Sequence, residues 1–309
     1  MPKIAHALLL VACSLVLQNA EHAQLDTPVE VVRIKQMKSA VVQIADVPDV
    51  PDAMAYTPQR AGTGFLVSAQ GYVLTAGHVI KDAEADARSS GIAKIKFKVG
   101  VLLDVVSQAT VINTRGSFSW LNAIPVEIDD IHDVALLRVS PNPFEHAVVE
   151  QSGKAPTLVT VARLDPRLPQ EGENLLVSGY PLQIPTFVTQ KGMVASESFE
   201  TVHSQHAPGF TVPEDMDSIL MDAVVNPGNS GGPVYDSQSG NVVGICEAFK
   251  QAPLLTNKSN PVPVGPYEYL KQNAGLAIVV PIKYAMDLLR KNGISDFSTA
   301  NNPRPESPR

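Results

Sequence analysis

Residues 62–80 read GTGFLVSAQGYVLTAGHVI, and this stretch decides the fold class of the chain. Two apolar runs, residues 64–67 and 72–75, flank the turn-forming residues 69–71. Short apolar runs joined by such a turn predict an antiparallel pair of β-strands. The stretch also presents a candidate functional residue, because His78 follows the second predicted strand after only two small residues.

The same pattern of short apolar runs continues on both sides of this predicted strand pair. Further apolar runs occur at residues 39–44, 92–99, 101–106, 109–112, 134–139, 157–161, 174–178, 187–194, 219–225, 242–245 and 276–280. Many short strands about ten residues apart predict an all-β sandwich or barrel. Residues 140–156 resemble a loop between two strand-rich halves, so we expect two domains of ordinary size.

Helices are few in this pattern. Residues 281–293 form the one clear helix, with Pro281 at its start and Gly293 as its stop, and residues 28–38 could form another short one. The polar, Pro-rich end of the chain is expected to be disordered. The predicted organisation is a signal peptide at 1–23, an N-terminal barrel at 28–150, a C-terminal barrel with the helix at 151–293, and a disordered tail at 294–309.

Composition narrows the function classes. The chain has 309 residues, of which 44% are hydrophobic and 18% charged, so it is neither disordered nor fibrous. A net charge of −7 argues against nucleic acid or an anionic membrane as the main partner. The 2 Cys exclude a disulfide-stapled scaffold, and Cys246, in an apolar run, is expected to be a buried small hydrophobe. We expect no metal and no cofactor.

Residues 1–23 indicate export. Lys3 precedes an apolar run at 7–17, and small residues at 20 and 23 could precede a cleavage point. The run is shorter than the ~20 residues that span a bilayer, so we expect no transmembrane segment in the mature chain. The predicted location is periplasmic or secreted. Residues 10–13 (LVAC) leave open a lipid anchor on Cys13, although the apolar run continues beyond it.

Three segments carry candidate chemistry. Residues 226–233 read NPGNSGGP, where glycines around Ser230 permit a tight turn that aims backbone N–H groups at one point. Asp133 stands directly before the apolar run at 134–139, where its carboxylate could accept a hydrogen bond from His78. Each feature alone is more often an ordinary turn or a structural histidine. Asp129 and Asp130 are competing carboxylates near Asp133.

Together these segments resemble the chymotrypsin-like serine peptidases of the HtrA/Deg branch. The resemblance rests on residues 62–80, HDVALLRV (132–139), SGYPLQIPTFVTQKGMVAS (178–196), MDAVVNPGNSGGPVYD (221–236), VVGI (242–245) and GLAIVVPI (275–282). It implies two six-stranded antiparallel β-barrels with the active site between them, His78 and Asp133 from the first barrel and Ser230 from the second. It also implies a homotrimer, the common state of HtrA relatives.

The resemblance further implies an exported serine endopeptidase that acts on proteins or peptides through an acyl-enzyme. The N–H groups of Gly228 and Ser230 would form the oxyanion hole, and Val224 would lie at the base of the pocket for the residue before the scissile bond. An apolar Val224 favours small or medium aliphatic residues there, although the nearby Asp222 keeps a basic preference open.

Two departures from the family pattern stand out. The chain ends about twenty residues after the last predicted helix, which leaves no room for a PDZ domain, and residues 81–126 and 248–273 look like insertions.

Two other functions remain open on the same fold. A glutamyl-endopeptidase-like enzyme would need carboxylate-binding groups in the pocket, and none is evident. A chaperone or peptide-binding scaffold without turnover would have no chemical need for His78, Asp133 and Ser230 together.

Overall fold

The computed structural model describes residues 28–50, 57–102, 118–142, 161–200, 217–255 and 270–300. The predicted signal peptide, Cys13 and residues 301–309 lie outside these ranges, as does most of the loop between the two halves. None of the helices in the described ranges has both the length and the apolar composition needed to cross a membrane.

Six strands of the first half close into an antiparallel barrel in the order β1-β2-β3-β6-β5-β4. Their bounds are β1 (Val41–Pro48), β2 (Gln59–Leu66), β3 (Tyr72–Ala76), β4 (Ile95–Leu102), β5 (Phe118–Asp129) and β6 (Val134–Val139). Successive side chains of a strand point to opposite faces, and both faces are used here. On β6, Ala135 and Leu137 fill the barrel, whereas Val134 and Leu136 point outward into a second core.

The second half repeats this arrangement. Its barrel follows the order β10-β11-β12-β9-β8-β7 and encloses its own apolar core. The strands are β7 (Asn174–Gly179), β8 (Val188–Glu200), β9 (Asp217–Asp222), β10 (Pro233–Asp236), β11 (Val242–Pro253) and β12 (Lys271–Pro281). The prediction of two six-stranded antiparallel barrels is confirmed.

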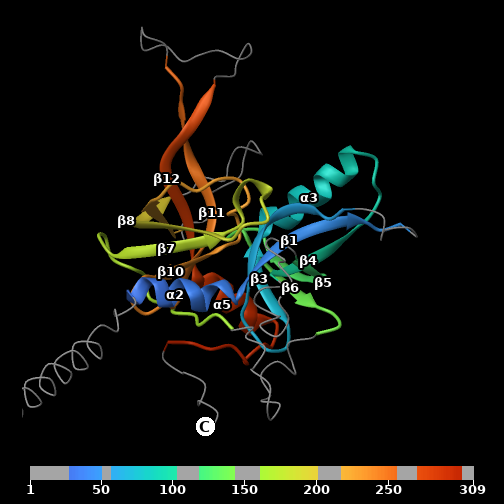
Figure 1. The fold of residues 1–309 in the computed structure, drawn as a ribbon, viewed down its shortest axis with the longest axis horizontal. Helices are drawn as coiled ribbons and strands as arrows, with labels where there is room; N and C mark the ends of the chain where they lie inside the picture. Colours follow the sequence, from blue (N-terminus) through green and yellow to red (C-terminus); the bar gives the residue numbers. More distant parts are fainter. Residues whose placement is uncertain are drawn as a thin grey trace, which may run out of the picture.

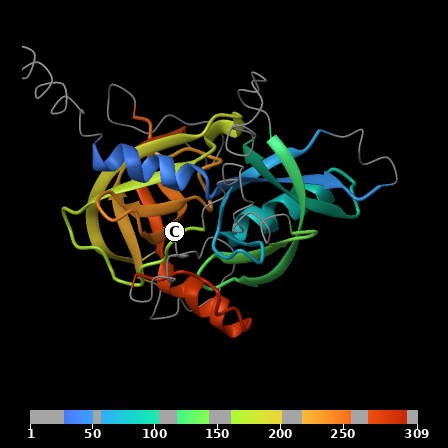
Figure 2. The same ribbon diagram turned by 60° about the horizontal axis from the view of Figure 1, so that its bottom comes forward.

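A shared core joins the two barrels, which lie side by side (Figure 2). Phe65 and Leu74 enter it from the first barrel, and Tyr235 and Ile245 from the second. The helix α5 (Ile282–Lys291) adds Leu289 and other apolar residues from below, and the shorter α2 (Val29–Lys38) contributes Met37. The barrels are thus fixed to each other by continuous apolar packing.

Two stretches that looked like insertions belong to the fold. Residues 81–126 supply most of the helix α3 (Gly77–Ser89) together with β4 and β5, without which the first barrel could not close. The helix was missed because it begins with a glycine directly after β3, although its buried residues recur at three- and four-residue spacing. Within 248–273, β11 and β12 extend as a paired ribbon beyond the barrel (Figure 1).

The expectation of disorder from residue 294 is wrong for residues 294–300. Ile294 is buried in the shared core, and Phe297 packs against it. The backbone N–H of Ala300 donates to the carbonyl oxygen of Leu164 at 2.9 Å. Two apolar side chains within a polar segment are enough to hold it on the barrel.

Leu289→Ala is expected to lower the free energy of unfolding by about 2–5 kcal/mol, because it opens a void in the core that joins the barrels. Urea denaturation followed by circular dichroism measures the change. Arg290→Ala on the exposed face of the same helix should alter stability by less than about 0.5 kcal/mol, since it removes only an exposed ion pair with Asp287. Equal losses in both variants would contradict the assigned packing.

Candidate functional site

His78 and Asp133 are brought together by the pairing of β3 with β6. Ala76 lies opposite Val134 in this pair, so the residues after β3 meet the residue before β6. The His78 ring Nδ1 lies 2.6 Å from Asp133 Oδ2, and the backbone N–H of His78 donates to Oδ1 at 2.7 Å. One carboxylate therefore holds both the ring and the backbone of His78.

Asp133 adopts an unusual backbone conformation. Its φ of 54° lies in the left-handed region, which Asp tolerates better than most residues but which still costs energy. Its carbonyl oxygen accepts a hydrogen bond from the N–H of Gly77 at 2.9 Å. A Cβ on Gly77 would lie only 3.0 Å from Asp133 Oδ1, so the glycine makes room for the carboxylate.

The loop that carries Ser230 is hydrogen-bonded directly to the first barrel. The backbone N–H of Thr63 on β2 donates to the Ser230 carbonyl oxygen at 2.9 Å, and the Thr63 hydroxyl donates to the Gly228 carbonyl oxygen at 2.6 Å. Gly231, with φ of 82°, packs so closely on Thr75 that a Cβ would collide with its hydroxyl. Ser230 thus lies beside the residues that lead into His78.

The Ser230 hydroxyl donates to the carbonyl oxygen of Glu247 at 3.0 Å. Among the hydrogen bonds between described residues, none joins Ser230 to His78. The structure therefore shows His78 and Asp133 joined by hydrogen bonds, whereas the Ser230 hydroxyl is hydrogen-bonded to the neighbouring strand β11.

Backbone N–H groups in this loop divide into two sets. Those of Asn229, Gly231 and Gly232 donate to backbone carbonyl oxygens at 2.7–3.0 Å. Those of Gly228 and Ser230 donate to no acceptor within the described ranges. These two are the donors that the family resemblance implies for an oxyanion hole.

The peptide before Gly228 is fixed in orientation. Leu182 donates its N–H to the Pro227 carbonyl oxygen at 2.6 Å. Because the carbonyl and N–H of a trans peptide point in opposite directions, this bond turns the Gly228 N–H away from Leu182. A Cβ on Gly228 would lie 2.5 Å from the Tyr180 carbonyl oxygen, and its φ is 99°, so this position requires glycine.

The surroundings of His78 raise the pKa of its imidazole above the ordinary value of 6.5. Burial alone would lower this pKa, but the hydrogen bond and the charge of Asp133 outweigh it, helped by the negative charge of Asp82. The imidazolium form is therefore stabilised at this position.

Glu247 is a site residue that the sequence reasoning missed. Its side chain is only 4% exposed, although it directly follows Cys246 in a strand of apolar residues. Burial, and after it the charge of Asp133, raises the pKa of Glu247 to about 8, although His78 and Lys250 act in the opposite direction. A glutamate within a buried apolar run was the signal that could have revealed it.

Two other predicted positions are readily located. Val224 follows β9, is 56% exposed and has its Cγ2 about 4.0 Å from where a Cβ on Gly275 would lie. Cys246 is buried and in the free thiol form, as expected, and burial raises its pKa to about 12. It therefore carries no thiolate at neutral pH.

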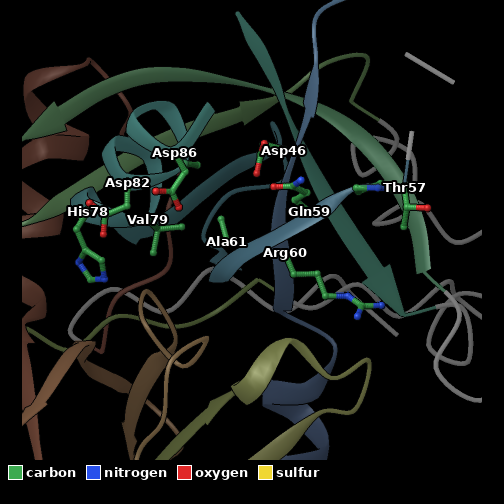
Figure 3. A pocket seen from close by; sticks show the side chains of 11 residues that line it. Asp46, Thr57, Gln59, Arg60, Ala61, His78, Val79, Asp82 and Asp86 are labelled. Atoms are coloured by element: carbon green, nitrogen blue, oxygen red, sulfur yellow. The ribbon is translucent and has the colours of Figure 1, made fainter. Parts of the chain in front are cut away.

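A cavity of about 680 Å³ opens beside His78 on the side of the first barrel. Figure 3 shows its wall, formed by side chains from β1, β2 and α3. Three aspartates line it, Asp46, Asp82 and Asp86. In the described ranges, no three His, Cys, Asp or Glu side chains are grouped so that they could hold a metal ion.

The chain is similar to known proteins in both sequence and structure. The family model described as "Trypsin-like peptidase domain" matches residues 62–245. The chain is 30% identical over 240 residues to a "Probable periplasmic serine endoprotease DegP-like" from Pseudomonas putida (strain W619), covering 76% of this chain and 36% of that protein. It is 27% identical over 214 residues to "Serine protease HTRA1" from Xenopus tropicalis, covering 69% and 36%.

Among solved structures, "HtrA-type protease AlgW with decapeptide" superposes with a TM-score of 0.52 at 18% sequence identity, covering 85% of this chain and 66% of that one. This likeness supports the fold. The chain spans about a third of the length of the curated relatives it matches.

Glu247→Gln is expected to change how stability depends on pH. The folded-state pKa of about 8 exceeds the ordinary 4.5, so the folded chain keeps a proton that the unfolded chain loses, and stability falls as pH rises through this window. Keeping this proton therefore costs the wild type several kcal/mol of folding free energy by pH 8. Gln cannot ionise, so the variant should gain several kcal/mol relative to wild type between pH 5 and pH 8.

Urea denaturation at pH 5, 6.5 and 8 measures this difference. The exposed Glu171→Gln serves as the control, and its stability should follow the wild type at every pH. A Glu247→Gln curve parallel to the wild type would show that Glu247 ionises normally in the folded chain.

Proposed function

This chain belongs to the trypsin-like peptidase domain family, and from that premise we propose that it hydrolyses peptide bonds with Ser230, His78 and Asp133. The observation that carries the proposal is the pair of hydrogen bonds that His78 donates to the Asp133 carboxylate, next to a serine loop that is hydrogen-bonded to the same barrel. The types of the three side chains match the roles of nucleophile, general base and orienting carboxylate, which supports the proposal.

In this mechanism Asp133 selects the tautomer of His78. With the proton on Nδ1 donated to Asp133, Nε2 is left to accept the proton of Ser230. The Ser230 hydroxyl must first leave the Glu247 carbonyl oxygen, a side-chain rotation that takes place in picoseconds to nanoseconds at exposed positions. Catalytic hydrogen bonds are often completed only when substrate is bound.

Bond making and breaking then follow the acyl-enzyme route. Ser230 Oγ attacks the scissile carbonyl carbon while its proton passes to His78 Nε2. His78 returns this proton to the amide nitrogen, the C–N bond breaks, and the amine leaves. Water, deprotonated by His78, hydrolyses the ester and regenerates Ser230.

We assign oxyanion stabilisation to the N–H groups of Gly228 and Ser230. Both lack an acceptor in the described part of the chain, whereas their neighbours in the loop are engaged. One such donor is worth ~10²–10³ in rate. The bond from Leu182 to Pro227 supports this assignment, because it holds the Gly228 peptide in a single orientation before substrate arrives.

We extend the proposal to the substrate, the location and the oligomeric state of the protein. We propose protein or peptide substrates with a small or medium aliphatic residue before the scissile bond, where the exposed Val224 supplies apolar surface. Export to the periplasm or beyond is supported by residues 1–23 and by the periplasmic naming of the relatives. A homotrimer is proposed from the HtrA resemblance alone, and light scattering on the purified protein tests it.

A fluorophosphonate probe should label the wild type and not Ser230→Ala. Its phosphorus bonds to Ser230 Oγ, fluoride leaves, and His78 takes the proton, so labelling requires an activated serine. Intact-mass spectrometry measures the adduct, and circular dichroism checks that both proteins are folded. A folded wild type that stays unlabelled would contradict turnover and favour a peptide-binding scaffold.

The rate is expected to fall at acid pH with a midpoint above 6.5. The general base must be unprotonated, and the raised pKa of His78 moves its protonation to higher pH. Asp133→Asn removes the main stabilising group, so kcat should drop by about 10⁴-fold. Measuring kcat and kcat/KM from pH 5 to 9 checks both points, and a midpoint of kcat/KM at or below 6.5 would contradict the assigned pairing.

A further inference from the structure

The wall of the cavity beside His78 includes one face of the helix α3. His78, Asp82 and Asp86 follow one another at four-residue spacing, which aligns them on the same side of a helix. Asp46 on β1 faces them from the barrel (Figure 3). The cavity therefore begins at the proposed general base and continues along a row of carboxylates.

These three carboxylates have no cationic partner in the described ranges. The basic residues of α3 pair elsewhere, Lys81 with Asp130 at 2.9 Å and Arg88 with Glu84 at 3.8 Å. Arg60 also lines the cavity, but its side chain extends away from the three aspartates in Figure 3. The ion pairs between described residues thus do not involve the three aspartates of this wall.

Asp46 is the most buried of the three aspartates. It is only 8% exposed, and no side chain in the described ranges makes a hydrogen bond or an ion pair to its carboxylate. Burial, and to a smaller extent the charge of Asp86, raises the pKa of Asp46 to about 6 despite a hydrogen bond with its own backbone. Above that pH a buried carboxylate stays ionised without a counter-charge, an arrangement that a bound cation would relieve.

The place of the cavity decides which half of a substrate would reach it. In the proposed mechanism His78 delivers a proton to the leaving amine, so the residues after the scissile bond lie on the His78 side. Eight helical residues separate His78 from Asp86, a rise of about 12 Å. An extended peptide advances ~3.3 Å per residue, so three or four residues cover that distance.

We propose that this cavity binds a Lys or Arg side chain of the substrate, located within three residues after the scissile bond. The proposal rests on the proposed peptidase function and deepens it by naming a substrate class. The three aspartates do not gather into a metal site, so an extended cationic side chain suits their spacing better than an ion.

The test compares three quenched fluorescent peptides that share one aliphatic sequence before the scissile bond and carry Lys, Ala or Glu two residues after it. At pH 8 and low salt, kcat/KM should decrease from Lys to Ala to Glu, with Lys about tenfold or more above Glu. In 0.5 M NaCl the ratio should shrink, because the carboxylates of α3 are exposed to solvent.

Asp86→Asn should reduce the Lys-to-Glu ratio about threefold, with cleavage of the Ala peptide by the same variant as the internal reference. Asp46→Asn, which keeps the shape of the buried side chain, provides a second variant with the same expected direction. Glu84→Gln is the matched control, since Glu84 pairs with Arg88 and does not line the cavity. It should leave the ratio unchanged.

Equal kcat/KM for the three peptides, or a lysine preference that neither Asp variant reduces, would overturn the proposal. That result differs from failure of the peptidase function itself, in which no peptide is cleaved and the fluorophosphonate does not label Ser230. Mapping the cleaved bond by mass spectrometry confirms that the Lys lies on the leaving-group side, and cleavage after the Lys instead would also overturn the assignment.

Discussion

The site depends on the hydrogen bonds of Thr63, a fully buried residue on β2. Its N–H and hydroxyl hold the carbonyl oxygens of Ser230 and Gly228, its hydroxyl accepts from the N–H of Tyr180, and its carbonyl oxygen accepts from the hydroxyl of Thr75. One residue of the first barrel therefore fixes the serine loop of the second. Buried polar groups that are fully bonded in this way specify one arrangement, because any slip would leave several of them unsatisfied.

The carboxylate side of the site is held by a different part of the chain. Tyr284 on α5 stacks on His132, the neighbour of Asp133, with ring centroids 3.7 Å apart. The ring Nδ1 of His132 also lies 2.7 Å from Asp129 Oδ2. Lys291 and Asn292, at the end of α5, bond to Glu127 on β5. The helix after the last strand thus contacts the neighbour of Asp133 and the strand that precedes it in the first barrel.

The ionisable side chains that act on His78 are acidic. Asp133 contacts the imidazole, and Asp82 and Glu247 add further carboxyl groups nearby. Burial resolves part of this repulsion by keeping Glu247 protonated near neutral pH. The remaining negative charge faces the cavity along α3, where it is exposed to a substrate. The same acidic surroundings that favour an imidazolium therefore also bear on which peptides are drawn to the site.

Sequence alone determined the class of fold, because short apolar runs separated by turn-forming residues are local features of the chain. It also singled out His78, Asp133 and Ser230 as candidates, through residue type and motif order. The helix α3 was missed because it begins with a glycine directly after β3, although its buried residues recur at helical spacing. The role of residues 81–126 in closing a barrel could not be predicted, because strand pairing joins residues far apart in the sequence. The position of Glu247 against Asp133, the row of aspartates facing Asp46, and the Thr63 bonds were decided only by tertiary structure, since burial and charge proximity arise when separate elements pack.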